Sequence, residues 1–423
     1  MTSSRLLLVS SLIGLVVSQH AGDTPDIHPP ITTWECTKAG GCVEKKTHIV
    51  LDSLAHPVHL VGDSSVGCGS WGNPPPEDIC PDKETCQQNC VMEGVQDYSQ
   101  YGVTTDGGSL RLDMLSDSGA TLSPRVYLLS EDKKSYEMMQ LTGKEFSFDV
   151  DVSKLPCGMN GALYLSEMPA DGGLSDLNKA GAPWGTGYCD AQCYTTPFVG
   201  GEPNIEGYGA CCNEMDIWEA NSRAAHLAPH PCNQTGLYKC EGAECAYEGI
   251  CDKDGCGYNP WRFDNFESYG LGLEVDTTRP FTVISQYPAD ENGVLQAYRR
   301  MYIQDGKLIK NGAVNITDLP QVDYLSDELC TAINSRRYGE LGATKGMGEA
   351  LARGMVLAFS VWWDEGGFMK WLDSGEAGPC NDTEGDPKHI REIQPDTEVT
   401  FSNIKWGEIG STFGPVKCAD KRR

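Results

Sequence analysis

The chain has 423 residues, of which 39% are hydrophobic and 22% charged, which is enough for a sizeable core and excludes wholesale disorder. Its 33 Lys and Arg face 60 Asp and Glu, giving a formal net charge of −27. Such a charge repels phosphate backbones and anionic lipid surfaces, so we expect no nucleic-acid and no membrane partner. A neutral substrate remains compatible with it.

The N-terminal segment, residues 1–18, reads MTSSRLLLVSSLIGLVVS. One Arg precedes an apolar run that is too short to span a bilayer, and small residues follow it, which is typical of a secretory signal peptide. The alternative is a buried N-terminal helix. We therefore expect a secreted, extracellular protein whose 19 cysteines form disulfides, with at least one left over because the number is odd. The glycosylation sequons at Asn233, Asn315 and Asn381 fit the same route.

The remaining chain shows no linker and no repeat, which predicts one domain over residues 19–420 and a short basic tail, residues 421–423. Polar and apolar residues alternate with a period of two in most segments, as in half-buried strands. These segments are 110–114, 146–152, 281–287 and 399–406, and residues 125–129 form a further strand-like run. A helical period is clear only in short pieces such as 347–353. Many strands in one large domain predict an all-β fold, a large β-sandwich of jelly-roll (concanavalin-like) type.

The most informative segment is ACCNEMDIWEAN, residues 210–221, which places three carboxylates within six residues. On a regular strand Glu214 and Asp216 share one face and Glu219 points away from it. One β-bulge between Asp216 and Glu219 would return all three to the same face. Carboxylates gathered in this way repel one another and raise at least one pKa, which suits a glycosidase that needs one ionised and one protonated group. The alternative is a solvated acidic strand or one turn of an amphipathic helix.

The stretch CCNEMDIWEAN resembles the active-site strand of glycoside hydrolase family 7, the fungal cellulases. Further blocks resemble the family in order along residues 31–413, among them VLDSLAHPVH, YGVTTDGGSLRL, GTGYCDAQC, CDKDGCGYNPWR and FSNIKWGEIGST. The resemblance implies a retaining double-displacement mechanism. Glu214 matches the nucleophile, Glu219 the general acid/base, and Asp216 the helper carboxylate that bonds to the nucleophile.

His230 matches the family's histidine near the leaving-group side, although a structural histidine in a Pro-rich loop is the alternative. His226 and His230 also have an H-x-x-x-H spacing, but Pro229 disfavours a helical zinc site. We expect no metal and no cofactor.

The resemblance also implies a substrate cleft with sugar-stacking aromatics and polar groups. It assigns to this cleft Tyr164, Asp190, Gln192, Trp362, Trp371, Arg125, Asp254 and Arg262. Ala55 and Pro57 stand where similar cellobiohydrolases carry tryptophans, and the segments 198–211 and 240–251 are short. Trimmed loops imply an open cleft and internal cleavage. We therefore expect a monomeric endo-β-1,4-glucanase acting on β-glucan polysaccharides.

The family pattern further implies nine disulfides, with Cys418 outside the set. The implied pairs are Cys36–Cys42, Cys68–Cys90, Cys80–Cys86, Cys157–Cys380, Cys189–Cys212, Cys193–Cys211, Cys232–Cys251, Cys240–Cys245 and Cys256–Cys330. Two of them would hold the carboxylate strand. The alternatives to an endoglucanase are a cellobiohydrolase, a non-catalytic lectin-like glycan-binding protein and a structural extracellular protein.

Overall fold

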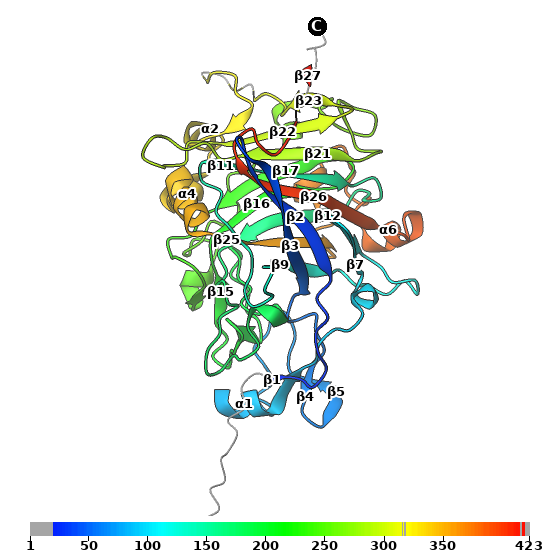
Figure 1. Ribbon diagram of the computed structural model, residues 1–423, viewed down its shortest axis with the longest axis vertical. Helices are drawn as coiled ribbons and strands as arrows, with labels where there is room; N and C mark the ends of the chain where they lie inside the picture. The colour runs from blue at the N-terminus through cyan, green and yellow to red at the C-terminus, as the bar shows by residue number, and fades with distance from the viewer. Residues whose placement is uncertain (1–19, 315, 317–318, 415–416, 419–423) are drawn as a thin grey trace, which may run out of the picture.

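A computed structural model describes residues 20–314, 316, 319–414 and 417–418 (Figure 1). The predicted signal peptide, the basic tail and the sequon at Asn315 lie outside these residues. Most strands belong to one continuous 17-stranded sheet. This sheet folds over on itself, because β2 (Pro30–Thr37) pairs with strands of both layers.

The front layer runs in the order β3, β9, β25, β12, β16, β17. The bounds of its strands are β3 (Gly41–Leu51), β9 (Arg125–Leu129), β10 (Met138–Met139), β12 (Met159–Ser166), β16 (Glu214–Ala220), β17 (Ala225–His230) and β25 (Met355–Trp363). The short β10 pairs with the start of β25. All these pairs are antiparallel, so residues that lie opposite one another share a face.

The back layer runs in the order β7, β8, β26, β11, β21, β22, β23, β27. Its strands are β7 (Val103–Asp106), β8 (Ser109–Asp113), β11 (Lys144–Asp151), β21 (Phe281–Gln286), β22 (Tyr298–Gln304), β23 (Lys307–Lys310), β24 (Tyr324–Leu325), β26 (Glu398–Glu408) and β27 (Lys417–Cys418). β24 pairs with the start of β22. The five segments predicted above as strands form β8, β9, β11, β21 and β26.

The main core fills the space between the layers. Alternate residues of the back layer, such as Phe148 and Phe401, meet apolar residues of the front layer, such as Leu163 and Phe359. β12 is buried on both faces over its whole length, so it lacks the polar alternation of a half-exposed strand. The predicted all-β sandwich is confirmed.

Helices and small sheets lie at the margins of the sandwich. The helices are α1 (Lys83–Asn89), α2 (Asp327–Ala332), α3 (Arg336–Glu340), α4 (Ala343–Arg353), α5 (Lys370–Asp373) and α6 (Pro387–Ile393), with 3₁₀ turns η1 (Tyr98–Tyr101), η2 (Ala182–Trp184), η3 (Gly242–Cys245) and η4 (Pro260–Phe263). The small sheets contain β1 (His20–Ala21), β4 (Val58–Leu60), β5 (Asp63–Gly67), β6 (Cys90–Met92), β13 (Phe198–Val199), β14 (Glu202–Pro203), β15 (Gly209–Cys211), β18 (Tyr238–Cys240), β19 (Tyr269–Gly270) and β20 (Val275–Asp276). In Figure 1, α1 and the sheet of β1, β4, β5 and β6 occupy the lower end of the molecule.

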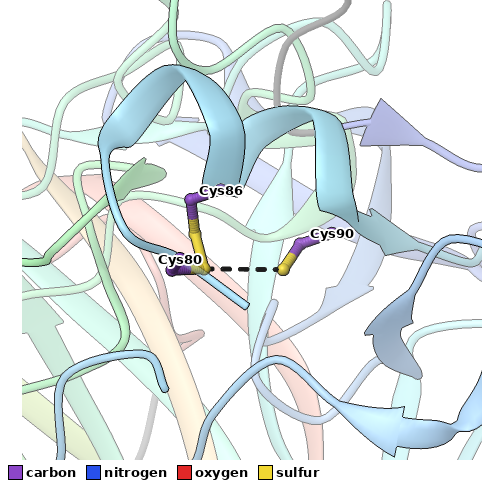
Figure 2. A group of neighbouring side chains, drawn as sticks. All are labelled: Cys80, Cys86 and Cys90. Carbon is purple, nitrogen blue, oxygen red and sulfur yellow. Dashed lines mark hydrogen bonds between the residues drawn. A yellow bond between two sulfur atoms is a disulfide. The ribbon is translucent and has the colours of Figure 1, made fainter. Parts of the chain in front are cut away.

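All nine disulfides implied by the family pattern are present. Figure 2 shows the sulfur cluster beside α1, where Cys80 and Cys86 are bonded and the sulfur of Cys90 lies 3.8 Å from that of Cys80. Cys90 is itself bonded to Cys68. The three clusters of possible metal-binding side chains found in the described residues all draw their cysteines from disulfides, so none offers a thiolate there.

Candidate active site

The carboxylate strand β16 carries the predicted bulge. Asp216 lies opposite Ala228 of β17 and Glu219 lies opposite His226, so β16 has one more residue than its partner between these pairs. Ile217 and Trp218 both enter the core as a result. Glu214, Asp216 and Glu219 therefore share the face that is turned away from the core. Their exposed fractions are only 8%, 7% and 9%.

Each carboxylate has a polar partner. The backbone N–H of Ala191 donates to Glu214 Oε2 over 3.1 Å, and Asn160 Nδ2 donates to Glu219 Oε1 over 2.8 Å. Asp216 Oδ2 lies 3.0 Å from His230 Nε2. Adjacent disulfides, Cys189–Cys212 and Cys193–Cys211, fix the chain just before the strand.

Burial sets the protonation of this cluster. It raises the pKa of Glu214 well above its ordinary value, and the neighbouring carboxylates of Asp216 and Asp190 add to the rise. Burial and then the charge of Asp216 raise the pKa of Glu219 to about 8. The cluster therefore retains at least one proton in neutral and mildly acidic solution, shared between two glutamates whose pKa values are both raised.

Two histidines of β17 line the same face. Burial lowers the pKa of His230, but the hydrogen bond and charge of Asp216 outweigh it and raise that pKa to about 10. His230 Nδ1 bonds to the carbonyl of Asp252 at 2.9 Å, and the residue lies opposite Glu214. His226, opposite Glu219, has a pKa that burial lowers to about 3, so its ring is neutral.

Glycines let the backbone approach both rings closely. A Cβ on Gly255 would lie 2.7 Å from His230 Cε1, and one on Gly257 would lie 2.4 Å from His226 Nε2. These distances are too short for any larger residue without a shift. The packing of the two imidazoles thus requires both glycines of the sequence DGCGYN.

A row of side chains crosses the front layer at the level of Glu219. Opposite residues in successive strands are Arg125 of β9, Ser360 of β25, Ala162 of β12, Glu219 of β16 and His226 of β17. The two residues between Arg125 and Glu219 are small. At an interstrand spacing of about 4.8 Å, Arg125 lies roughly 14 Å from the carboxylate strand.

Several other predicted residues adjoin the carboxylates. Tyr164 follows Ala162 on the same face, and its hydroxyl lies 3.2 Å from that of Tyr188. Tyr188 donates to Asp190 Oδ2 over 2.9 Å, and burial raises the pKa of Asp190. Gln192 Nε2 donates to the carbonyl of Lys253 over 2.8 Å.

Trp362 lies directly opposite Asn160 in the pairing of β25 with β12, so it shares the face of Glu219. It is half-buried. Trp371, the second predicted tryptophan, lies at the other side of the carboxylates, with its ring 5.8 Å from that of His226.

The polar residues predicted beside Trp371 are more dispersed. Arg262 donates to the carbonyl of Trp371 over 3.1 Å, which places it at this end of the row. Asp254 is exposed and accepts a hydrogen bond from Tyr247. It is connected to the carboxylates through its loop, in which the carbonyl of Asp252 bonds to His230.

Arg300 of β22 is a residue that the sequence analysis missed. It is 1% exposed, packs against Trp218 with its guanidinium carbon 5.1 Å from the ring, and forms no ion pair within the described residues. Nη2 donates to the carbonyls of Ile217 and His226, and Nη1 donates to that of His226 over 3.2 Å. Because a bulge leaves a strand carbonyl without its ladder partner, Arg300 satisfies the backbone at the point where the bulge forms.

Asn160 was also missed, although its spacing from Ala162 and Tyr164 places all three on one strand face. Arg300 could have been found from the alternation in β22. Tyr298, Arg300 and Tyr302 occupy alternate positions, so they share one strand face, and a charged residue thus lies among those that face the core. Asp52, which bonds Arg125 Nη2 at 3.0 Å, has no local signal because it follows β3 in a turn.

One hollow lies apart from the carboxylates. It has a volume of about 430 Å³ and is lined by residues that include Glu167, Glu202 and Lys239. Its charges are already paired, Glu167 with Arg353 at 2.7 Å and Glu202 with Lys239 at 2.9 Å. The carboxylate face gathers two glutamates whose pKa values are strongly raised, as in a catalytic site, whereas in the hollow the burial of Glu202 is outweighed by effects that include the hydrogen bond from Lys239 and that lower its pKa.

The arrangement places two buried carboxyl groups on one face of the sheet. One can act as an ionised carboxylate and the other as a proton donor at the same bond of a substrate. No described helix has the length and apolarity needed to cross a lipid bilayer.

Comparison with known proteins gives concordant results. The family described as glycosyl hydrolase family 7 matches residues 21–413. Endoglucanase EG-1 of Humicola insolens is 58% identical over 98% of this chain and 96% of its own. The native structure of the Humicola insolens endocellulase EGI superimposes with a TM-score of 0.92 at 58% identity, covering 93% of this chain and 100% of that one. An endoglucanase I complexed with cellobiose gives a TM-score of 0.91 at 54% identity, with 93% and 100% coverage.

Proposed function

The chain belongs to glycosyl hydrolase family 7, and we propose that Glu214 and Glu219 are the two groups with which it cleaves internal β-1,4 bonds of cellulose and related β-glucans. The membership makes the chain a glycoside hydrolase, and its activity is that of an endo-β-1,4-glucanase. The observation that carries the residue assignment is the bulge that brings both glutamates and Asp216 to one face.

In the first step Glu214 attacks the anomeric carbon through a carboxylate oxygen. The bond from that carbon to the glycosidic oxygen breaks as Glu219 gives its proton to the leaving sugar. In the second step a water molecule attacks the same carbon, Glu219 accepts the proton from the water, and Glu214 is released. Two inversions retain the configuration of the sugar.

The hydrogen-bond partners favour this division of roles. The backbone N–H of Ala191 can only donate, so it always favours an ionised Glu214. The amide of Asn160 can donate to Glu219 or, after rotation, accept from it through Oδ1, an atom that otherwise has no partner. A protonated Glu219 therefore keeps its hydrogen bond, whereas a protonated Glu214 faces a donor. His230 and Asp216 form the adjoining ion pair that orients the helper carboxylate.

We further propose that the protein is secreted and acts as a monomer through one catalytic domain. The nine disulfides support an oxidising compartment. Asn233 and Asn381 are exposed and open to glycosylation. Tyr164, Asp190, Gln192, Trp362, Trp371, Arg125, Asp254 and Arg262 are the proposed substrate contacts.

The test follows viscosity and reducing ends together on carboxymethylcellulose. Internal cleavage lowers the viscosity steeply while few reducing ends appear, and NMR of the first product detects the β-anomer. A slow fall in viscosity with mainly cellobiose released would contradict internal cleavage, and an initial α-anomer would contradict the assignment of Glu214 as nucleophile. Glu214→Gln protein, prepared in the same way, controls for contaminating cellulases.

A further inference from the structure

An aromatic cluster outside the predicted set adjoins Arg125, which stands at one end of the row. Trp71 and Tyr194 are exposed by 40% and 51%, and their ring centroids lie 5.8 Å apart. Trp71 also lies 5.9 Å from the ring of Tyr188. We call Trp71 and Tyr194 the aromatic shelf.

The shelf rests on a charged support. The guanidinium carbon of Arg125 lies 4.9 Å from the ring of Trp71 and 3.5 Å from that of Tyr188. Asp52 pairs with Arg125 at 3.0 Å and accepts a hydrogen bond from Tyr127, which fixes the arginine from below. Arg125 therefore backs one side of Trp71, and 40% of the tryptophan remains in contact with solvent.

The shelf is tied to the catalytic strand through the chain that carries it. Tyr194 follows Cys193, whose disulfide to Cys211 adjoins β16, and Cys193 has a φ of 58°, which few residues other than glycine adopt. The N–H of Gly72 donates to the carbonyl of Thr195 over 3.0 Å, and this bond joins the loop of Trp71 to the segment of Tyr194. Tyr188 connects the shelf to Tyr164 and Asp190.

From this geometry we propose that the aromatic shelf binds a glucosyl unit of the β-glucan chain on the glycone side, beyond the units held between Arg125 and Glu219. The side follows from the other end of the row, where His226 and Trp371 adjoin the proton donor and so receive the leaving sugar. Flat, exposed aromatic faces suit the apolar faces of pyranose rings, and a neutral ligand avoids the repulsion that the net charge of −27 imposes on anions. This inference rests on the proposed function.

The test compares substrates that do and do not reach the shelf. We expect Trp71→Ala to lower kcat/KM for cellohexaose about tenfold, because one sugar–aromatic contact of this kind is lost. The same variant keeps the parent's kcat/KM for an aryl β-cellobioside, which is too short to reach Trp71. Trp71→Phe restores most of the loss, and Tyr194→Ala lowers only the value for the long substrate.

The matched control is Tyr324→Ala. Tyr324 also carries an arginine on its ring, Arg299 at 5.0 Å, but it lies in the back layer. This variant should leave both substrates unaffected. Equal values for Trp71→Ala and parent on cellohexaose, or an equal loss on both substrates, would overturn the shelf while leaving the glucanase activity in place. A parent enzyme that cleaves neither substrate would instead overturn the proposed function.

Discussion

The carboxylate strand and the aromatic shelf handle the same proposed substrate under opposite physical conditions. Glu214, Asp216 and Glu219 are each less than one-tenth exposed, while Trp71 and Tyr194 are 40% and 51% exposed. Acid–base chemistry needs burial, because burial moves a carboxyl pKa to where it is useful. Recognition of an uncharged sugar needs only an open, flat face. The two regions share the disulfide-bonded segment from Tyr188 to Tyr194.

The largest contrast is expected from Glu214→Gln. This change removes the proposed nucleophile without altering the size of the side chain, and we expect kcat to fall by roughly 10⁴-fold. The measurement is turnover of an aryl β-cellobioside, with circular dichroism to confirm an unchanged fold. Trp71→Ala serves as the comparison, because it should keep full kcat on this substrate. Appreciable turnover by Glu214→Gln would remove the carboxylate strand from the mechanism.

Much of the carboxylate strand is accessible from the sequence because its signals are local. On a strand, the spacing of Glu214, Asp216 and Glu219 requires a bulge to bring all three to one face, and the resemblance to the family identified this segment as the active-site strand. The disulfide pairing came from the family pattern, since spacing alone allows many connectivities. Strands such as β12 and β25 give no alternation, because both of their faces are buried.

Local sequence patterns do not show which residues support the carboxylate strand or which form the aromatic shelf. Arg300 acts on Ile217 across the sandwich, 83 residues away in sequence, so no local motif links them. Trp71 lies in an irregular loop, where no periodicity indicates which way a side chain points. Its place beside Arg125 depends on a hydrogen bond between two loops. Long-range packing therefore sets the parts that the sequence does not reveal.

Arg300, which contacts the carboxylate strand from the core side, gives a further test of how that strand differs from the aromatic shelf. Arg300→Met should lower kcat roughly 100-fold with a smaller change in KM, because the bulge loses the donor that fixes Glu219. The loss of a positive charge should also raise the pKa of Glu219, which moves the alkaline limb of the kcat–pH profile to higher pH.

Arg300→Lys separates position from charge, because lysine keeps the charge but has no fork to reach both carbonyls. We expect it to restore the alkaline limb and to leave kcat low. Near-UV circular dichroism checks that both variants retain the packing around Trp218. Parent-like kcat in Arg300→Met would show that the bulge holds without this residue.

The smallest expected effect concerns stability. Burial of the Glu219 carboxyl makes the stability of the fold depend on pH, whereas the uncharged residues of the aromatic shelf cause no such dependence. The pKa of Glu219 is raised from 4.5 to about 8, so the folded protein keeps a proton that the unfolded chain releases. Its contribution to stability is therefore lost progressively as the pH rises from 4.5 towards 8. Glu219→Gln removes this dependence and should raise Tm by roughly 2–5 °C at about pH 7.5, with little change near pH 4. Scanning calorimetry at both pH values measures the difference, and for Trp71→Ala the shift in Tm should be the same at both. A pH-independent shift for Glu219→Gln would mean that Glu219 ionises in the folded protein as freely as in water, and the proton needed by the leaving sugar would then have to come from another group.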